Sequence, residues 1–153
     1  MMDPLSIIAS TAALLGLIDQ VVRGVRKLAR IKQTSLLLQQ LNNELSDLRL
    51  IVGKVEDICR QASFRNSDFV FDQEALSRAI DRAKNAILEL KKVIEYSLPA
   101  PSEKISGRID RLFRIRKESE IRDGRDRLRD AKWNLSTTIQ LGQMYNIQHP
   151  RAS

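Results

Sequence analysis

The chain has 153 residues, of which 42% are hydrophobic and 29% charged, with six glycines, four prolines and 5% aromatic residues. A chain of this length fits one domain, which can bury about 70% of the surface that the unfolded form exposes. The composition excludes a disordered chain, a collagen-like repeat and a turn-rich all-β sandwich, so we expect an all-α fold. The single cysteine, Cys59, excludes an internal disulfide and favours a reducing, cytoplasmic location.

The formal net charge of +7 is unevenly distributed along the chain. Residues 21–32 hold five basic side chains and no acidic one, and residues 104–132 hold eleven basic and six acidic side chains. The rest of the chain is therefore mildly acidic. An excess of this kind favours anionic partners, and its position points to these two stretches.

The first predicted helix has an apolar stripe whose members recur every three or four residues. They are Ile7, Thr11, Leu14, Ile18, Val21, Val25 and Leu28. Up to Ile18 the opposite face is also uncharged and consists of Ala, Ser, Thr and Gly. Such a helix is either buried on every side or has lipid as a second environment. The uncharged run of residues 5–18 is shorter than the roughly 20 residues that span a bilayer, so spanning requires either that the helix extends to about Lys32 or that the bilayer thins locally.

Three further stretches show helical periodicity. The second stripe comprises Leu38, Leu41, Leu45, Leu48, Val52, Val55 and Cys59; the third, Leu76, Ile80, Ala83, Ile87, Leu90 and Ile94; and the last, Leu128, Ala131, Leu135, Ile139 and Gly142. Residues 63–71 interrupt the pattern, and Pro99 and Pro101 end the third helix. Ser102 can cap a further helix that carries Ile105, Ile109 and Leu112, and the last stripe is out of phase with these residues, which predicts a bend or break near residues 116–119. We expect an up-and-down bundle of four to five long helices over residues 1–145, with a flexible tail over 146–153.

Three segments carry a resemblance to a known family. They are Met2-Asp3-Pro4-Leu5-Ser6-Ile7-Ile8-Ala9-Ser10, Leu41-Asn42-Asn43-Glu44-Leu45-Ser46-Asp47-Leu48-Arg49 and Arg127-Leu128-Arg129-Asp130-Ala131-Lys132-Trp133-Asn134-Leu135. Together they resemble the HeLo-like N-terminal domains of fungal STAND and NLR-like receptors, over nearly the whole chain.

The resemblance implies a helical bundle related to the executioner domain of necroptosis. It also implies a role in programmed cell death, heterokaryon incompatibility or innate immunity. In that family the domain is held inactive until an upstream NLR or amyloid sensor clusters it, and its N-terminal helix then permeabilises the plasma membrane. The resemblance therefore implies an anionic phospholipid membrane and further copies of the chain as partners.

The expected membrane-inserting residues are Leu5, Ile7, Ile8, Leu14, Leu15, Leu17 and Ile18, and the expected anionic-lipid contacts are Arg23, Arg26, Lys27, Arg30 and Lys32. Two small-xxx-small pairs, Ala9/Ala13 and Ala12/Gly16, allow close helix contact in membranes. The simpler alternative is a central core helix with no lipid role. A second functional alternative is a helical oligomerisation or adaptor module of a receptor without membrane activity.

Catalysis and cofactors are not expected. The only histidine, His149, lies in the predicted tail, which leaves no Ser/His/Asp arrangement and no two-histidine metal site. The basic stretch 104–132 is either a solvated face with internal ion pairs or a lipid contact. It lacks the zinc spacing and interleaved aromatics of nucleic-acid binders. We predict that Cys59 fills space in the core and that Trp133 lies at the bundle surface or in a partner groove.

Overall fold

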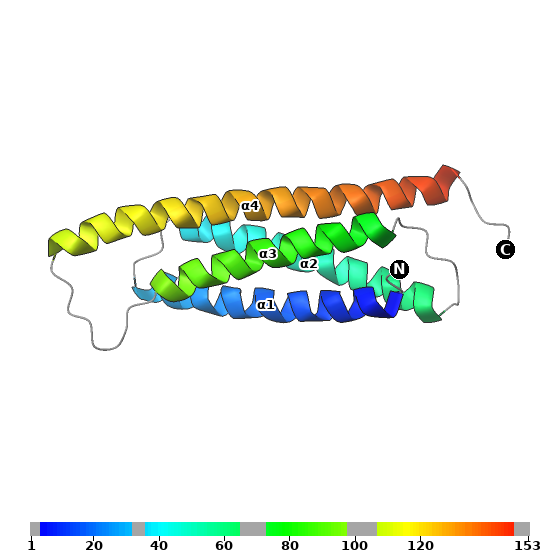
Figure 1. Cartoon of the computed structure of the whole chain (residues 1–153), viewed down its shortest axis with the longest axis horizontal. Helices are drawn as coiled ribbons and strands as arrows, with labels where there is room; N and C mark the ends of the chain where they lie inside the picture. Colours follow the sequence, from blue (N-terminus) through cyan, green and yellow to red (C-terminus); the bar gives the residue numbers. More distant parts are fainter. Residues whose placement is uncertain (1–3, 32–35, 65–72, 98–106, 149–153) are drawn as a thin grey trace.

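The computed structural model describes residues 4–31, 36–64, 73–97 and 107–148, which form four long helices (Figure 1). These are α1 (Pro4–Ile31), α2 (Leu36–Phe64), α3 (Gln73–Ser97) and α4 (Gly107–Gln148). Successive helices run in opposite directions, so α1 is parallel to α3, and α2 is parallel to α4. The predicted all-α up-and-down bundle is confirmed, with four helices.

The four helices occupy the corners of a square. α1 packs against α2 and α3, and α4 packs against the same two helices. Among the described residues no close backbone contact joins α1 to α4 or α2 to α3, so these two pairs lie on the diagonals. α1 and α4 therefore present their solvent-facing sides in opposite directions (Figure 1).

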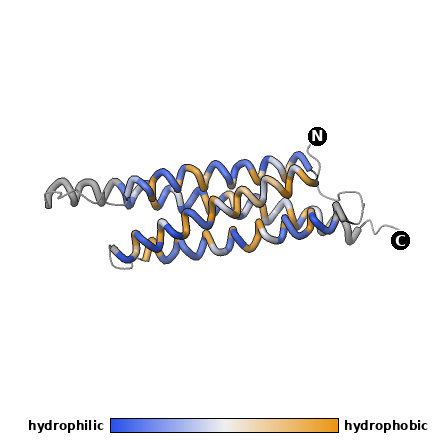
Figure 2. Tube along the Cα trace, turned by 90° about the horizontal axis from the view of Figure 1, so that it is seen from below, coloured by the Kyte–Doolittle hydropathy of each residue, from blue (hydrophilic) through white to orange (hydrophobic). Residues whose placement is uncertain are grey.

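The predicted stripes form the core. Every member of the four stripes is buried, and Figure 2 shows hydrophobic and hydrophilic positions recurring along the helices, as in amphipathic helices. Two buried hydroxyl groups in this core are satisfied within their own helices, since Thr11 Oγ1 donates to the Ile8 carbonyl at 2.8 Å and Ser97 Oγ to the Val93 carbonyl at 2.6 Å. The core is thus one continuous apolar cluster.

Two glycines lie where side chains of a neighbouring helix approach closely. A Cβ added at Gly24 of α1 would lie 2.8 Å from Cγ2 of Ile94 in α3, and one added at Gly124 of α4 would lie 2.9 Å from Cδ1 of Leu90 in α3. Both distances are shorter than van der Waals contact. A Cβ at either position would therefore force the side chain of Ile94 or Leu90 to shift within the core.

The predicted break near residues 116–119 was wrong, because α4 is one unbroken helix of 42 residues. Lys117 extends the buried stripe of α4: it is 8% exposed, and its Nζ lies 5.4 Å from the centroid of the Tyr96 ring. A long lysine side chain can bury its stem while its ammonium group meets an aromatic face, so it can occupy a core position. Among the residues of α4 whose burial is described, the stripe stays in phase from Lys117 through Ile121 to Gly142.

The ends of the helices differ slightly from the prediction. α4 continues to Gln148, so residues 146–148 of the predicted tail are helical. Residues 149–153 lie outside the described residues, as do residues 65–72 and 98–106, which connect α2 to α3 and α3 to α4.

Candidate membrane-binding helix

α1 has the length that a membrane-spanning helix needs. It is unbroken over 28 residues, or about 42 Å at 1.5 Å per residue, compared with a hydrocarbon layer of about 30 Å. By length and composition its segment Leu5–Arg30 could cross a bilayer. The helix therefore extends beyond the uncharged run as far as Ile31, close to the predicted limit at Lys32. Buried core helices pass the same test, so the surroundings of the side chains must be considered.

Most of the predicted inserting residues face the bundle. Ile7, Leu14 and Ile18 are fully buried, whereas Ile8, Leu15 and Leu17 are partly buried and pack against the core. Only Leu5 is exposed, at 63%. The six buried and partly buried side chains could enter lipid only if α1 left its place between α2 and α3.

The opposite face of α1 is exposed and uncharged over its first four turns. Ala9, Ala12, Ala13 and Gly16 are all exposed. A Cβ added at Gly16 would meet nothing within 4 Å, so packing within the bundle does not require a glycine there. The helix is therefore not buried on every side, which excludes the first of the two explanations for its uncharged composition.

The second half of the same exposed face is basic. Arg23, Arg26, Lys27 and Arg30 are exposed, and none of them forms an ion pair with another described residue. Lys32, the fifth predicted lipid contact, lies outside the described residues. Asp19 lies between the two halves and pairs with Arg49 of α2 at 3.4 Å. α1 therefore presents an uncharged face that continues into a cationic one.

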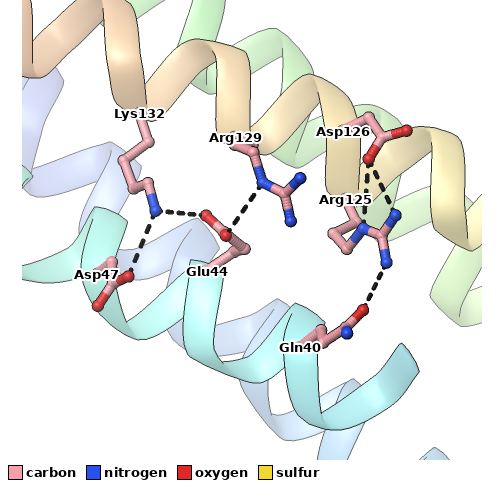
Figure 3. Close-up of polar contacts among 7 residues, drawn as sticks. All are labelled: Gln40, Glu44, Asp47, Arg125, Asp126, Arg129 and Lys132. Atoms are coloured by element: carbon pink, nitrogen blue, oxygen red, sulfur yellow. Dashed lines mark hydrogen bonds and ion pairs between the residues drawn. The ribbon is translucent and has the colours of Figure 1, made fainter. Parts of the chain in front are cut away.

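The second basic stretch has a different role in the bundle, because three of its side chains bind α2 (Figure 3). Arg125 donates to Gln40 at 2.5 Å, Arg129 lies 3.4 Å from Glu44, and Lys132 lies 2.6 Å from Glu44 and 3.3 Å from Asp47. We call these six residues the polar seam. Arg125–Gln40, Arg129–Glu44 and Lys132–Asp47 are each separated by 85 residues, as expected for parallel neighbouring helices in register, and Lys132 also reaches Glu44 one turn earlier.

The polar seam shifts two pKa values in opposite directions. Burial raises the pKa of Glu44, but the hydrogen bonds and charges of Lys132 and Arg129 outweigh it, so the pKa lies below its usual value. The hydrogen bond and charge of Glu44, assisted by Asp47, hold the pKa of Lys132 above its usual value despite partial burial. Both groups are therefore ionised at neutral pH, and three basic residues of 104–132 serve helix packing.

The polar seam was not predicted from the sequence, although a signal was present. Gln40, Glu44 and Asp47 have spacings of four and three residues, and so do Arg125, Arg129 and Lys132. Matching spacings of polar or acidic residues on one helix and basic residues on another suit a parallel pair. These spacings predict contacts between the two helices only once α2 and α4 are known to be parallel neighbours.

The outward face of α4 carries two large apolar side chains in contact with solvent. Trp133 is 73% exposed and Leu141 is 62% exposed. The prediction that Trp133 lies at the bundle surface agrees with this position. Nearer the start of α4, Asp126 is exposed and accepts hydrogen bonds from its neighbour Arg125.

Groups with catalytic or metal-binding chemistry are sparse in the described part of the chain. Cys59 is buried, as predicted, and burial raises the pKa of its thiol to about 11. The described residues contain no group of three or more His, Cys, Asp or Glu side chains that could hold a metal ion. His149 lies outside the described residues.

Comparison with known proteins adds no relative: no protein-family model matches the chain, and neither the curated proteins nor the solved structures contain a match.

Proposed function

We propose that this chain is a non-enzymatic helical bundle that binds anionic membranes and permeabilises them through α1, as its resemblance to HeLo-like cell-death domains implies. The observation that supports this most is the outward face of α1. Over Leu5–Gly16 this face is uncharged although it is exposed, and over Arg23–Arg30 it is basic. A solvated helix in a helical bundle ordinarily carries charged residues on its outer face.

The bundle is the resting state in this proposal. The inward face of α1 completes the core, and the exposed basic residues contact lipid head groups first. At about 1 kcal/mol for each Lys or Arg near an anionic surface, the four exposed side chains contribute about 4 kcal/mol. Such a gain favours the lipid-bound state by a factor of about 1000.

Permeabilisation requires α1 to exchange its position in the core for lipid. The three remaining helices would then expose their apolar stripes to water, at about 25 cal/mol for each Å² uncovered. Association with other copies would cover that surface, which is why an oligomer is expected on activation. The trigger would be clustering by an upstream NLR or amyloid sensor, with relocation from the cytoplasm to the plasma membrane.

Charge reversal tests the lipid contact without disturbing the core. The variant Arg23→Glu, Arg26→Glu, Lys27→Glu should no longer co-sediment with vesicles of anionic phospholipid. A matched control reverses three exposed lysines on the other helices, Lys54, Lys84 and Lys92, and so makes the same change in net charge. The control should retain most of the binding. Equal loss in both variants would show that net charge alone is responsible and would contradict a specific role for α1.

A second candidate function is an interaction module without membrane activity. The exposed side chains of Trp133 and Leu141 favour it, because exposed aromatic residues are enriched at protein interfaces. This candidate predicts self-association or partner binding in the absence of lipid, and no retention by anionic vesicles. Sedimentation with and without vesicles distinguishes the two functions.

A further inference from the structure

The exposed side of α1 can be described as one strip along the helix. Its members are Leu5, Ala9, Ala12, Gly16, Arg23 and Lys27, which we call the α1 outer strip. They are separated by three, four or seven residues, so they lie on one side of the helix. All are exposed. The first four are apolar or small, and the last two are basic.

The exposed side of α4 forms a second strip. Its members are Asp123, Asp126, Asp130, Trp133 and Leu141, which we call the α4 outer strip, and all are exposed. The first three are acidic and the last two are large and apolar. Three basic side chains beside this strip are already paired within the bundle, Arg127 with Glu89, Arg129 with Glu44 and Arg125 with Asp126 of the strip itself, and Arg122 is exposed next to Asp123.

Contacts between neighbouring helices fix how the two strips align along the bundle. The Asp19–Arg49 pair places residue i of α1 level with residue 68 − i of the antiparallel α2. The 85-residue offset of the polar seam then places it level with residue 153 − i of α4. Through α3, the Gly24–Ile94 approach and the Arg127–Glu89 pair place it level with residue 146 − i. The alignments obtained through α2 and through α3 differ by about two turns of helix.

With this alignment the strips are complementary from end to end. Trp133 is level with residues 13–20 of α1, an interval that contains Gly16. Leu141 is level with 5–12, which contains Ala9. The acidic residues Asp126 and Asp123 are level with 20–27 and 23–30, which contain Arg23 and Lys27. Large side chains of the α4 outer strip thus lie level with small side chains of the α1 outer strip, and its acidic side chains lie level with basic ones.

We propose that the closed bundle associates with further copies of itself, the α1 outer strip of one copy docking on the α4 outer strip of the next. Because α1 and α4 lie on a diagonal and face outward in opposite directions, a copy displaced sideways without rotation brings the two strips together. The open space over Gly16 receives the Trp133 side chain of the neighbour. Arg23 and Lys27 meet Asp126 and Asp123.

The interface has a definite symmetry. The two docking surfaces differ, so the contact is heterologous, and a displacement without rotation generates an open chain rather than a closed pair. The overlap runs for about 27 Å along the helices, from Asp123 to Leu141 at 1.5 Å per residue. The exposed tryptophan at its centre is expected to carry much of the affinity.

Two single substitutions test the interface in the absence of lipid, by sedimentation velocity over a range of concentrations. Trp133→Ala removes the large side chain, and Gly16→Gln fills the space opposite it; both positions are exposed, so the fold should be retained, as circular dichroism would verify. The wild type should associate, and each variant should weaken association by at least about tenfold.

Mixing the two variants distinguishes this interface from a symmetric one. Trp133→Ala retains an intact α1 outer strip and Gly16→Gln an intact α4 outer strip, so the mixture should form a one-to-one dimer that cannot extend. A mixture that stays monomeric would overturn the proposal, as would a wild type that is monomeric at every concentration. Association through α1 alone, unaffected by Trp133→Ala, would overturn it too.

A charge exchange separates this proposal from the membrane function. Arg23→Asp with Lys27→Asp, or Asp123→Lys with Asp126→Lys, should each weaken association, whereas all four together should restore it. The fourfold variant should still fail to bind anionic vesicles, because two of the four exposed basic side chains of α1 have been replaced by acidic ones. Restored association with lost vesicle binding supports both proposals. Failure to restore association overturns the interface alone, and undiminished vesicle binding contradicts the membrane function alone.

Discussion

Replacing Glu44 by Gln should destabilise the bundle by removing the charge at the centre of the polar seam. The Glu44 side chain is only 13% exposed, and Lys132, which lies 2.6 Å away, is 23% exposed. Hydrogen bonds between charged groups contribute about 1.5–3 kcal/mol when desolvated, and exposed ion pairs less than about 1 kcal/mol. This pair lies between those limits, and Lys132 keeps Asp47 as a partner. We therefore expect a loss of about 1–2 kcal/mol in the free energy of unfolding.

The measurement is thermal and urea unfolding of Glu44→Gln, followed by circular dichroism at 222 nm. A loss of this size lowers Tm by about 3–6 °C in a domain of this length. The control is Glu74→Gln, which removes the exposed Glu74–Arg78 pair within α3 and should cost less than about 0.5 kcal/mol. Because the pKa of Glu44 is lowered in the fold, its contribution is present above the ordinary value of 4.5 and is lost as the pH falls through the lower folded value. Equal losses in the two variants, or a Glu44 effect that persists in acid, would refute this reasoning.

Further predictions concern two glycines, Cys59 and Lys132. Gly16→Ala should stabilise the bundle by up to about 1 kcal/mol in urea unfolding, since its Cβ enters open space, whereas Gly24→Ala should destabilise it by about 1–3 kcal/mol, since its Cβ would meet Ile94 at 2.8 Å. Cys59, with its thiol pKa raised to about 11, should react with a thiol reagent at pH 8 only as fast as the protein unfolds; rapid labelling of the folded chain would contradict its burial. The raised pKa of Lys132 implies a stabilising contribution that is complete below 10.5 and is lost as the pH rises through the folded value, so Lys132→Met should lower stability at pH 8 and have less effect in strong alkali.

The core of this fold could be predicted from leucine spacing, because a side chain buried at every third or fourth position leaves its period in the sequence. All members of the four predicted stripes are buried. The failure came at Lys117, where a charged residue occupies a core position by burying its stem and directing its ammonium group toward Tyr96. A binary division into apolar and polar residues cannot represent such a side chain, so Lys117 was not recognised as a core position.

The arrangement of the helices around the square could not be predicted. The amphipathic patterns of α1 and α4 predict that one face of each helix is buried, but they do not predict which helices bury it. The polar seam and the alignment of the two outer strips depend on that choice. The succession of an uncharged first half and a basic second half in the α1 outer strip was visible in the sequence, but its exposure and the open space over Gly16 were not.

A disulfide between α1 and α3 would test whether α1 must leave the bundle to act on membranes. The Cβ position at Gly24 lies 4.0 Å from Cβ of Ile94, within the usual range for a disulfide. The corresponding distance from Gly124 to Leu90 is 3.9 Å, so a second disulfide can join α3 to α4 while leaving α1 unattached. Both pairs would be introduced with Cys59→Ala, which removes the only native thiol.

The decisive measurement is the leakage of dye from vesicles of anionic phospholipid, compared for the two crosslinked proteins before and after reduction. If α1 must leave the bundle, Gly24→Cys with Ile94→Cys should be inactive when oxidised and should permeabilise vesicles when reduced, whereas Leu90→Cys with Gly124→Cys should be active in both states. Leakage from the oxidised α1–α3 protein as fast as from its reduced form would show instead that α1 acts without leaving the core.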